Sequence, residues 1–398
     1  MGGDLLPIGR RVAYWRARRK MSQQAFADRL GKSKSWVDKI ERGVRSLDRL
    51  STIQEIAGVL RVDVPALLGR ELRPADVAHR VRGADEVRAA LSTYEIALAP
   101  PSTGRAVEPV ERVASMVAHA WTAYQHARYP SLMDLLPDLL ARAQRTHARD
   151  PGHGRGPLVD AYRVTALVLV KLGEAELAWL AADRAMAVAT GDRALVAAAA
   201  VQLGQVLRAA GRARSAMTAT LAAAYRIAPP DLDTGGPEEL SLCGALLVQA
   251  GLSAARLGDD SVAGLIDEAA DLAAKVGEGR DDFRIGFGPT AVDLARVAAA
   301  VDLGDGRDAV AWHEKVIDRP AWRWLPAEHR AEHLVNAARG YLQAGDPAGA
   351  GRVLMDAERT APAEIHHRPL AREVVAQVAR CPVAPSRIVH LAATIGVT

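Results

Sequence analysis

The sequence predicts an all-α protein in two parts, a short N-terminal helical bundle and a long array of paired helices. Apolar residues recur at helical spacing along most of the 398-residue chain, which is rich in alanine and poor in β-branched runs. Aromatic residues make up only 4% of the chain, so small side chains must dominate the packing. From about Val107 onward, glycine and alanine return several times in one frame, as expected of a repeat architecture.

Charge is distributed unevenly along the chain. The net charge is +4, but residues 1–70 hold 15 Lys/Arg against 7 Asp/Glu, whereas the remainder holds 36 against 40. A basic N-terminal part (the head) on a mildly acidic remainder (the body) is typical of a protein that contacts nucleic acid through the head alone. The alternative is that the basic residues of the head form only a solvated surface. No apolar run reaches the ~18 residues of a membrane span, which predicts a cytoplasmic, nucleoid-associated protein with no membrane partner.

Residues 1–70 predict five short helices. The first carries Ile8, Val12 and Trp15 on one apolar face. The later helices start at serines suited to N-capping or stop at glycines. The expected helices begin at Ile8 and then cover residues 23–30, 34–42, 50–60 and 64–69, with caps at Ser22, Ser33 and Ser46 and stops at Gly31 and Gly43.

The stretch Arg18–Gly43 resembles the DNA-binding domain of the XRE family, the Cro and phage-repressor type. The matching residues are SQQAFA at 22–27 and LGKSKSWVDKIERG at 30–43, and the resemblance spans Ile8 to Leu68. It implies a helix-turn-helix whose third helix offers its N-terminal turn to the DNA major groove.

This resemblance places nine residues at the DNA. Gln23 is expected to contact a phosphate together with helix-terminal N–H groups. Lys34, Ser35, Asp38 and Lys39 are expected to face base edges, and two arginines after the third helix to face the backbone. Trp36 stands where the family usually has a small polar residue, and phosphate repels Asp38, so no operator sequence is predicted. The expected DNA-binding residues are Gln23, Ser33, Lys34, Ser35, Trp36, Asp38, Lys39, Arg42 and Arg45.

A connector is expected between the two parts. Glu71 to Ala99 has an amphipathic helical pattern, and the PPSTGR stretch at 100–105 breaks it. The segment is either a linker helix lying on the next domain or a dimerisation helix. The predicted organisation is a DNA-binding domain at 1–70, a linker helix with a Pro-rich connector at 71–106, and a sensor and dimerisation domain with C-terminal capping helices at 107–398.

The body predicts a tetratricopeptide-repeat superhelical array. Tyr162–Ala189 matches the tetratricopeptide pattern, with small residues where paired helices cross and a glycine in the turn between them. The turn glycines are 38, 47, 46 and 41 residues apart, longer than the ~34 of the plain repeat, and the surplus falls in loops at 229–237 and 277–289. These glycines are Gly173, Gly211, Gly258, Gly304 and Gly345.

Head and body together resemble actinobacterial XRE regulators that carry a C-terminal tetratricopeptide domain. The use of 44 arginines against seven lysines, with one asparagine, is typical of a GC-rich genome. The resemblance implies a homodimeric transcriptional regulator of double-stranded DNA with a palindromic operator. The resemblance gives no effector, and we expect a small molecule, a peptide or a partner protein. The alternative is a tetratricopeptide interaction scaffold with secondary DNA binding.

The first helix of each repeat is expected to line an inner groove. Related regulators clasp a peptide backbone with a ladder of asparagines, and this chain has only Asn336. A mostly apolar groove with a few arginines suits a small amphipathic or acidic molecule equally well, and the alternative is that these residues form superhelix core. The expected ligand-binding residues are Arg163, Leu167, Gln205, Arg208, Leu252 and Arg339.

Enzymatic and metal chemistry are not expected. His329-Arg-Ala-Glu332-His333 matches a zinc-protease pattern and places two histidines on one helix face, but no third ligand is indicated. The two cysteines have no metal-like spacing, and no phosphate-binding loop, nucleophile elbow or catalytic triad pattern is present. We therefore expect no metal, no cofactor and no catalytic residue.

Overall fold

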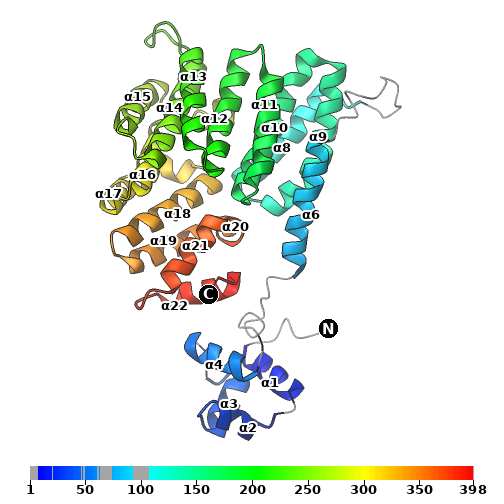
Figure 1. Cartoon of the computed structure of the whole chain (residues 1–398), viewed down its shortest axis with the longest axis vertical. Helices are drawn as coiled ribbons and strands as arrows, with labels where there is room; N and C mark the ends of the chain where they lie inside the picture. Colours follow the sequence, from blue (N-terminus) through cyan, green and yellow to red (C-terminus); the bar gives the residue numbers. More distant parts are fainter. Residues whose placement is uncertain are drawn as a thin grey trace. The chain divides into compact units, whose positions relative to one another are not determined.

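The computed structural model describes residues 8–19, 21–45, 47, 50–60, 62, 74–92 and 107–397. Within these ranges all regular structure is helical, which confirms the predicted all-α fold (Figure 1). The chain divides into two compact units, Met1–Arg80 with Arg372–Thr398, and Val81–Ala371.

Four helices of the N-terminal bundle are described: α1 (Ile8–Arg18), α2 (Gln23–Arg29), α3 (Lys34–Glu41) and α4 (Leu50–Leu60). The predicted caps are confirmed for α2 and α3, since the Ser22 and Ser33 hydroxyls accept hydrogen bonds from the N–H groups three residues on. Gly31 has a φ of 62°, so the turn between α2 and α3 uses a conformation that favours glycine. The predicted cap at Ser46 and the predicted helix over 64–69 lie outside the described residues.

The linker helix α6 (Pro74–Leu91) ends in the core of the second unit. Val87 and Leu91 are fully buried there, in one cluster with Met133 and Leu136 of the array. The Gln144 side chain also donates a hydrogen bond to the carbonyl of Ala90. The last turns of the linker helix therefore pack on their own chain, as expected of a linker helix that lies on the next domain. The predicted Pro-rich break at 100–105 lies outside the described residues.

Six antiparallel helix pairs follow one another within residues 107–361. In each pair the two helices contact one another, and the first helix also contacts the first helix of the next pair (Figure 1). The pairs are α8 (Val110–Gln125) with α9 (Tyr129–Arg149), α10 (Pro151–Lys171) with α11 (Ala175–Ala189), α12 (Arg193–Ala209) with α13 (Ala213–Ile227), α14 (Pro237–Leu257) with α15 (Val262–Val276), α16 (Pro289–Leu303) with α17 (Gly306–Ile317), and α18 (Ala327–Gln343) with α19 (Pro347–Thr360).

Short helices occupy the long loops and the end of the chain. They are η1 (Asp282–Arg284), η2 (Pro320–Trp324), α20 (Pro362–His367), α21 (Pro369–Ala379) and α22 (Ser386–Ile395). The two predicted insertions at 229–237 and 277–289 fall between helix pairs, as expected from the repeat spacing.

The turns inside the pairs confirm the predicted role of glycine. All five predicted turn glycines have positive φ values, from 65° to 84°. The first pair is the exception, because Ala127 occupies this position with a φ of 53°. The missing glycine explains why the repeat pattern is weak in this part of the sequence.

The first helices of the six pairs form a closed ring. The helix α8 contacts α10, and the contacts continue through α12, α14, α16 and α18. The helix α18 in turn contacts α8, so the last pair meets the first. A residue of the ring interior therefore faces side chains that are distant in sequence.

The central helix α14 is the most apolar of the ring. Its length and its mean hydropathy of 1.5 meet the criteria for a membrane span, but 83% of the apolar window is buried inside the array. A side chain at Gly244 would collide with the Phe287 ring at 2.1 Å, which shows how tightly the loop after α15 packs on it. The burial pattern is that of a core helix.

Candidate DNA interface and ligand cavity

The N-terminal turn of α3 is exposed, as a recognition helix requires. Lys34, Ser35 and Lys39 lie at the surface, while Val37 and Ile40 are buried in the bundle. The two predicted backbone contacts that follow α3, Arg42 and Arg45, are also exposed. The α3 surface therefore presents four cationic side chains over twelve residues, Lys34, Lys39, Arg42 and Arg45.

Four other predicted DNA-binding residues have partners within the bundle. Trp36 is half-buried against the apolar core of the bundle. The Ser33 hydroxyl accepts the N-cap hydrogen bond of Trp36 at 3.1 Å. The Asp38 carboxylate pairs with Arg42 at 3.4 Å, which offsets the charge that would repel a phosphate.

Gln23 belongs to a polar network around Glu41. The Glu41 carboxylate is buried and accepts hydrogen bonds from Arg16 at 2.6 and 3.0 Å and from the Gln23 amide at 2.9 Å. These contacts tie α1, α2 and α3 together at one point. The network thus sets the orientation of α3 relative to the other two helices.

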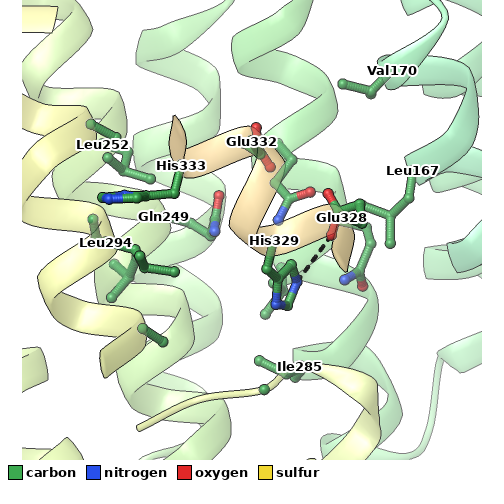
Figure 2. A pocket seen from close by; sticks show the side chains of 18 of the residues that line it. Leu167, Val170, Gln249, Leu252, Ile285, Leu294, Glu328, His329, Glu332 and His333 are labelled. Carbon is green, nitrogen blue, oxygen red and sulfur yellow. Dashed lines mark ion pairs between the residues drawn. The ribbon is translucent and has the colours of Figure 1, made fainter. Parts of the chain in front are cut away.

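A cavity of about 310 Å³ lies at the centre of the helical ring. The first helix of every pair contributes to its wall, together with the loop at 284–287. Figure 2 shows Gln249 between Leu252, Leu294 and His333 on one side and Leu167 and Val170 on the other. This size is at the lower end of the range for small-molecule sites.

The structure brings five of the six predicted ligand-binding residues to this cavity. They are Leu167, Gln205, Arg208, Leu252 and Arg339.

Arg163 lies elsewhere, with its side chain fully buried behind the cavity wall and its guanidinium 5.3 Å from the Trp121 ring. It donates hydrogen bonds to Asp160 and Gln202 and to the Phe283 carbonyl, at 2.6 to 2.7 Å. Its role in the structure is to hold the 281–287 loop against the ring.

A buried ionic cluster closes the ring, and we call Lys171, Glu328, Glu332, Glu364 and Arg368 the ring-closing cluster. The Lys171 ammonium contacts Glu328, Glu332 at 2.9 Å and Glu364 at 3.0 Å. Arg368 pairs with Glu332 at 2.7 Å and with Glu364 at 3.2 Å. The cluster therefore joins the second helix pair to the sixth pair and to α20.

Two tyrosines extend the ring-closing cluster to the first pair. The Tyr124 hydroxyl donates to Glu328 at 3.1 Å, and the Tyr129 hydroxyl donates to Glu364. Burial and the nearby carboxylates raise the pKa of both tyrosines, so both remain hydrogen-bond donors. These bonds span 204 and 235 positions of the sequence.

Charge pairing outweighs burial within the ring-closing cluster. Burial disfavours the Lys171 cation, but Glu328, Glu332 and Glu364 outweigh this effect and raise its pKa. Burial likewise raises the pKa of Glu332, yet Arg368 and Lys171 together hold it well below the usual value. Lys171 and Glu332 therefore stay ionised at neutral pH.

A second charged group lines the cavity, and we call Arg208, Arg256 and Arg339 the arginine group. Arg256 and Arg339 both pair with Asp302, at 2.6 and 3.1 Å. Arg208 donates to the Gln249 carbonyl at 3.2 Å and forms no ion pair with any described carboxylate. Burial, and then the charge of Arg256, lower the pKa of Arg208 to about 10, so it remains a cation at neutral pH.

The histidines of the predicted zinc-like pattern have other partners. His329 lies 3.3 Å from Glu328, and His333 is within 2.9 Å of His313 on the neighbouring helix. Burial lowers the pKa of His313 to about 4, and burial with the charge of His313 lowers that of His333 to about 3. Among the described residues, no three His, Cys, Asp or Glu side chains are grouped as metal ligands would be.

Several polar residues of the cavity were missed by the sequence analysis. Lys171, Glu328, Glu332 and Gln249 all line it, yet they stand beside the predicted groove positions rather than on them. The missed signal was the charge of Lys171, which follows the uncharged stretch 164–170 and requires a partner when buried.

Comparison with known proteins identifies the N-terminal part of the chain. Residues 7–70 match a family described as a helix-turn-helix domain. No curated protein matches the chain significantly.

Two solved structures are similar to this chain. BtubC (BKLC) from P. vanneervenii is 17% identical with a TM-score of 0.39, covering 66% of this chain and 94% of that chain. PlcR from Bacillus thuringiensis, solved in complex with the peptide PapR7 and DNA, is 13% identical with a TM-score of 0.27, covering 78% and 99%. Likeness at this level carries no conclusion about ligands or partners.

Proposed function

We propose that this protein is a sequence-specific, DNA-binding transcriptional regulator that acts as a homodimer and whose helical ring senses an effector. The observation that carries this proposal is the exposed N-terminal turn of α3 within the helix-turn-helix match at 7–70. Four cations, Lys34, Lys39, Arg42 and Arg45, stand on or just after this helix, where a duplex would offer guanine edges and phosphates.

The match of one helix-turn-helix domain per chain supports the proposed dimer. A single small domain makes few base contacts, and two such domains must lie ~34–36 Å apart to read both halves of a palindromic operator. An effector bound in the cavity would favour one curvature of the ring and thereby one spacing of the two heads. The effector class is a small molecule, a peptide or a partner protein.

The remaining functional assignments follow from this role. We place the protein in the cytoplasm with the bacterial chromosome, in an actinobacterium, and assign it no catalytic activity. Lys171, Glu332 and Arg368 at the cavity pair with one another or with Glu328, and these structural ion pairs favour binding over catalysis at this site.

The test is DNA binding by α3 variants of the full chain. We expect Lys34→Ala to weaken binding to the protein's own promoter DNA by about 1–3 kcal/mol and to relax base preference at one position. Binding is measured by fluorescence anisotropy at several salt concentrations, with Lys275→Ala in the array as the matched control. A loss that is uniform over all sequences, with a smaller salt slope, would assign Lys34 to a phosphate instead.

Two outcomes would contradict the regulator. If wild-type protein leaves promoter DNA unshifted while it retains partner proteins on an affinity column, the protein is an interaction scaffold. If sedimentation shows a strict monomer that binds single half-sites tightly, the spacing mechanism is wrong.

A further inference from the structure

The arginine group leaves positive charge at the cavity. Two of its three guanidinium groups share one carboxylate, Asp302, and the ion pairs of Arg256 and Arg339 occupy both of its oxygens. Arg208 is left with one carbonyl partner, the backbone oxygen of Gln249. A carboxylate would offer such a guanidinium a charge-assisted, bidentate contact that a neutral group cannot replace.

An unsatisfied acceptor lies beside this cation. The Gln249 side chain is only 8% exposed, and its Oε1 atom has no hydrogen-bond donor. Figure 2 shows this side chain projecting from α14 into the cavity. A buried amide oxygen without a donor costs free energy, and a ligand that brings an O–H or N–H group removes that cost.

Part of the wall is apolar. Leu167, Val201, Leu252, Leu294 and Ile285 line the cavity, so a hydrocarbon part of a ligand would be removed from water there. The volume of about 310 Å³ equals that of roughly ten water molecules in the liquid. This space suits a compact ligand.

We propose that the cavity binds a compact carboxylic acid that carries a hydroxyl or N–H group next to a short hydrocarbon chain. Its carboxylate pairs with Arg208, its hydroxyl or N–H donates to Gln249 Oε1, and its chain packs on Leu252 and Leu294. The inference rests on the proposed function only where it makes this acid the effector; the binding site stands on the cavity alone.

The experiment measures binding of three matched probes to the full chain by isothermal titration calorimetry. The probes are 3-hydroxyoctanoate, octanoate, which lacks the hydroxyl, and octane-1,3-diol, which lacks the charge. We expect 3-hydroxyoctanoate to bind best, octanoate to bind more weakly, and the diol to bind at least about tenfold more weakly than the hydroxy acid.

Two variants assign the contacts. In Arg208→Gln the preference for the hydroxy acid over the diol should fall by about tenfold, whereas Arg214→Gln, an exposed arginine on the outer helix α13, should leave it unchanged. In Gln249→Met the preference for the hydroxy acid over octanoate should disappear while both acids still bind. Circular dichroism and thermal unfolding verify that each variant is folded.

The outcomes separate this inference from the proposed function. Equal binding of the acids and the diol, or binding of none of the three by a protein that still binds DNA, overturns the ligand class and leaves the regulator standing. Binding of the hydroxy acid by a protein without DNA binding overturns the regulator and leaves the cavity site standing. A random peptide pool that binds where the acids do not also overturns the carboxylic acid.

Discussion

The ring-closing cluster and the arginine group line the same cavity but balance their charges differently. In the ring-closing cluster, two cations pair with three carboxylates, and every member has a partner in the cluster. In the arginine group, Arg256 and Arg339 share the Asp302 carboxylate, and Arg208 pairs with no described carboxylate. The ring-closing cluster pairs charges that the fold buries. The arginine group leaves Arg208 at the cavity without a carboxylate partner. We therefore expect the first to determine stability and the second to determine ligand preference.

The largest expected effect is loss of stability in Lys171→Met. Without the ammonium group, Glu328 and Glu364, whose side chains are at most 1% exposed, lose their shared cation. Breaking a buried ion pair by removing one partner costs about 3–5 kcal/mol. Urea unfolding followed by circular dichroism measures this cost, with Lys275→Met as control. Lys275 pairs with exposed Asp233, so its loss should change little, and an equally small change in Lys171→Met would show that the cluster does not hold the ring together.

Acid should reduce stability through the buried histidine pair and through the ring-closing cluster in different pH ranges. The pKa values of about 4 for His313 and about 3 for His333 lie below the ordinary value of 6.5, so below pH 6.5 the unfolded chain binds protons that the folded chain does not. Stability should therefore fall from pH 6.5 towards pH 4, by on the order of 3 kcal/mol for each of the two histidines.

The carboxylates respond in a lower pH range. The pKa of Glu332 is held below its ordinary value of 4.5, so its contribution is complete above pH 4.5 and is lost only as the pH falls further. Unfolding free energies measured at several pH values check both ranges. In a His313→Gln, His333→Gln double variant the slope between pH 6.5 and 4.5 should flatten, and a slope unchanged from wild type would exclude the histidines as its source.

The smallest effect is expected for Arg208→Met in the absence of ligand. This substitution removes a partly buried cation that has no carboxylate partner, so the lost carbonyl hydrogen bond is offset by the relief of its desolvation. We expect a change within about 1 kcal/mol in either direction, measured by the same urea unfolding. A loss as large as that of Lys171→Met would mean that the two charged groups are equally structural.

Much of the fold could be predicted because its determinants are local. The turn glycines and the serine caps each act on residues within one turn of a helix, so Gly173, Gly345, Ser22 and Ser33 have the predicted conformations or contacts. The helical repeat then placed Leu167, Gln205 and Arg208 on the inner face, since each stands at a fixed distance before a turn glycine.

The cavity's polar contacts could not be predicted because they depend on curvature. Whether Lys171 contacts Glu328 depends on the small rotation between each helix pair and the next, added over five successive pairs. No local sequence pattern predicts this total rotation. Arg163 shows the same limit on a smaller scale. Its position in the repeat matched the groove, but Asp160, Gln202 and the Phe283 carbonyl bind it behind the wall. The zinc-like spacing of His329 and His333 likewise gave no information about His313.

Closure of the ring changes how the repeats depend on one another. In an open array each repeat touches only its neighbours, so stability is nearly additive, and a pair can be inserted or deleted without disturbing distant ones. Here Tyr124 and Glu328 are joined across 204 positions, which gives the array the long-range contacts of a globular domain. The Tyr124–Glu328 hydrogen bond can form only if the number of helix pairs brings α18 next to α8. The helix pairs are therefore not interchangeable. Because their contacts form a closed ring, a substitution that destabilises one pair is expected to destabilise the others.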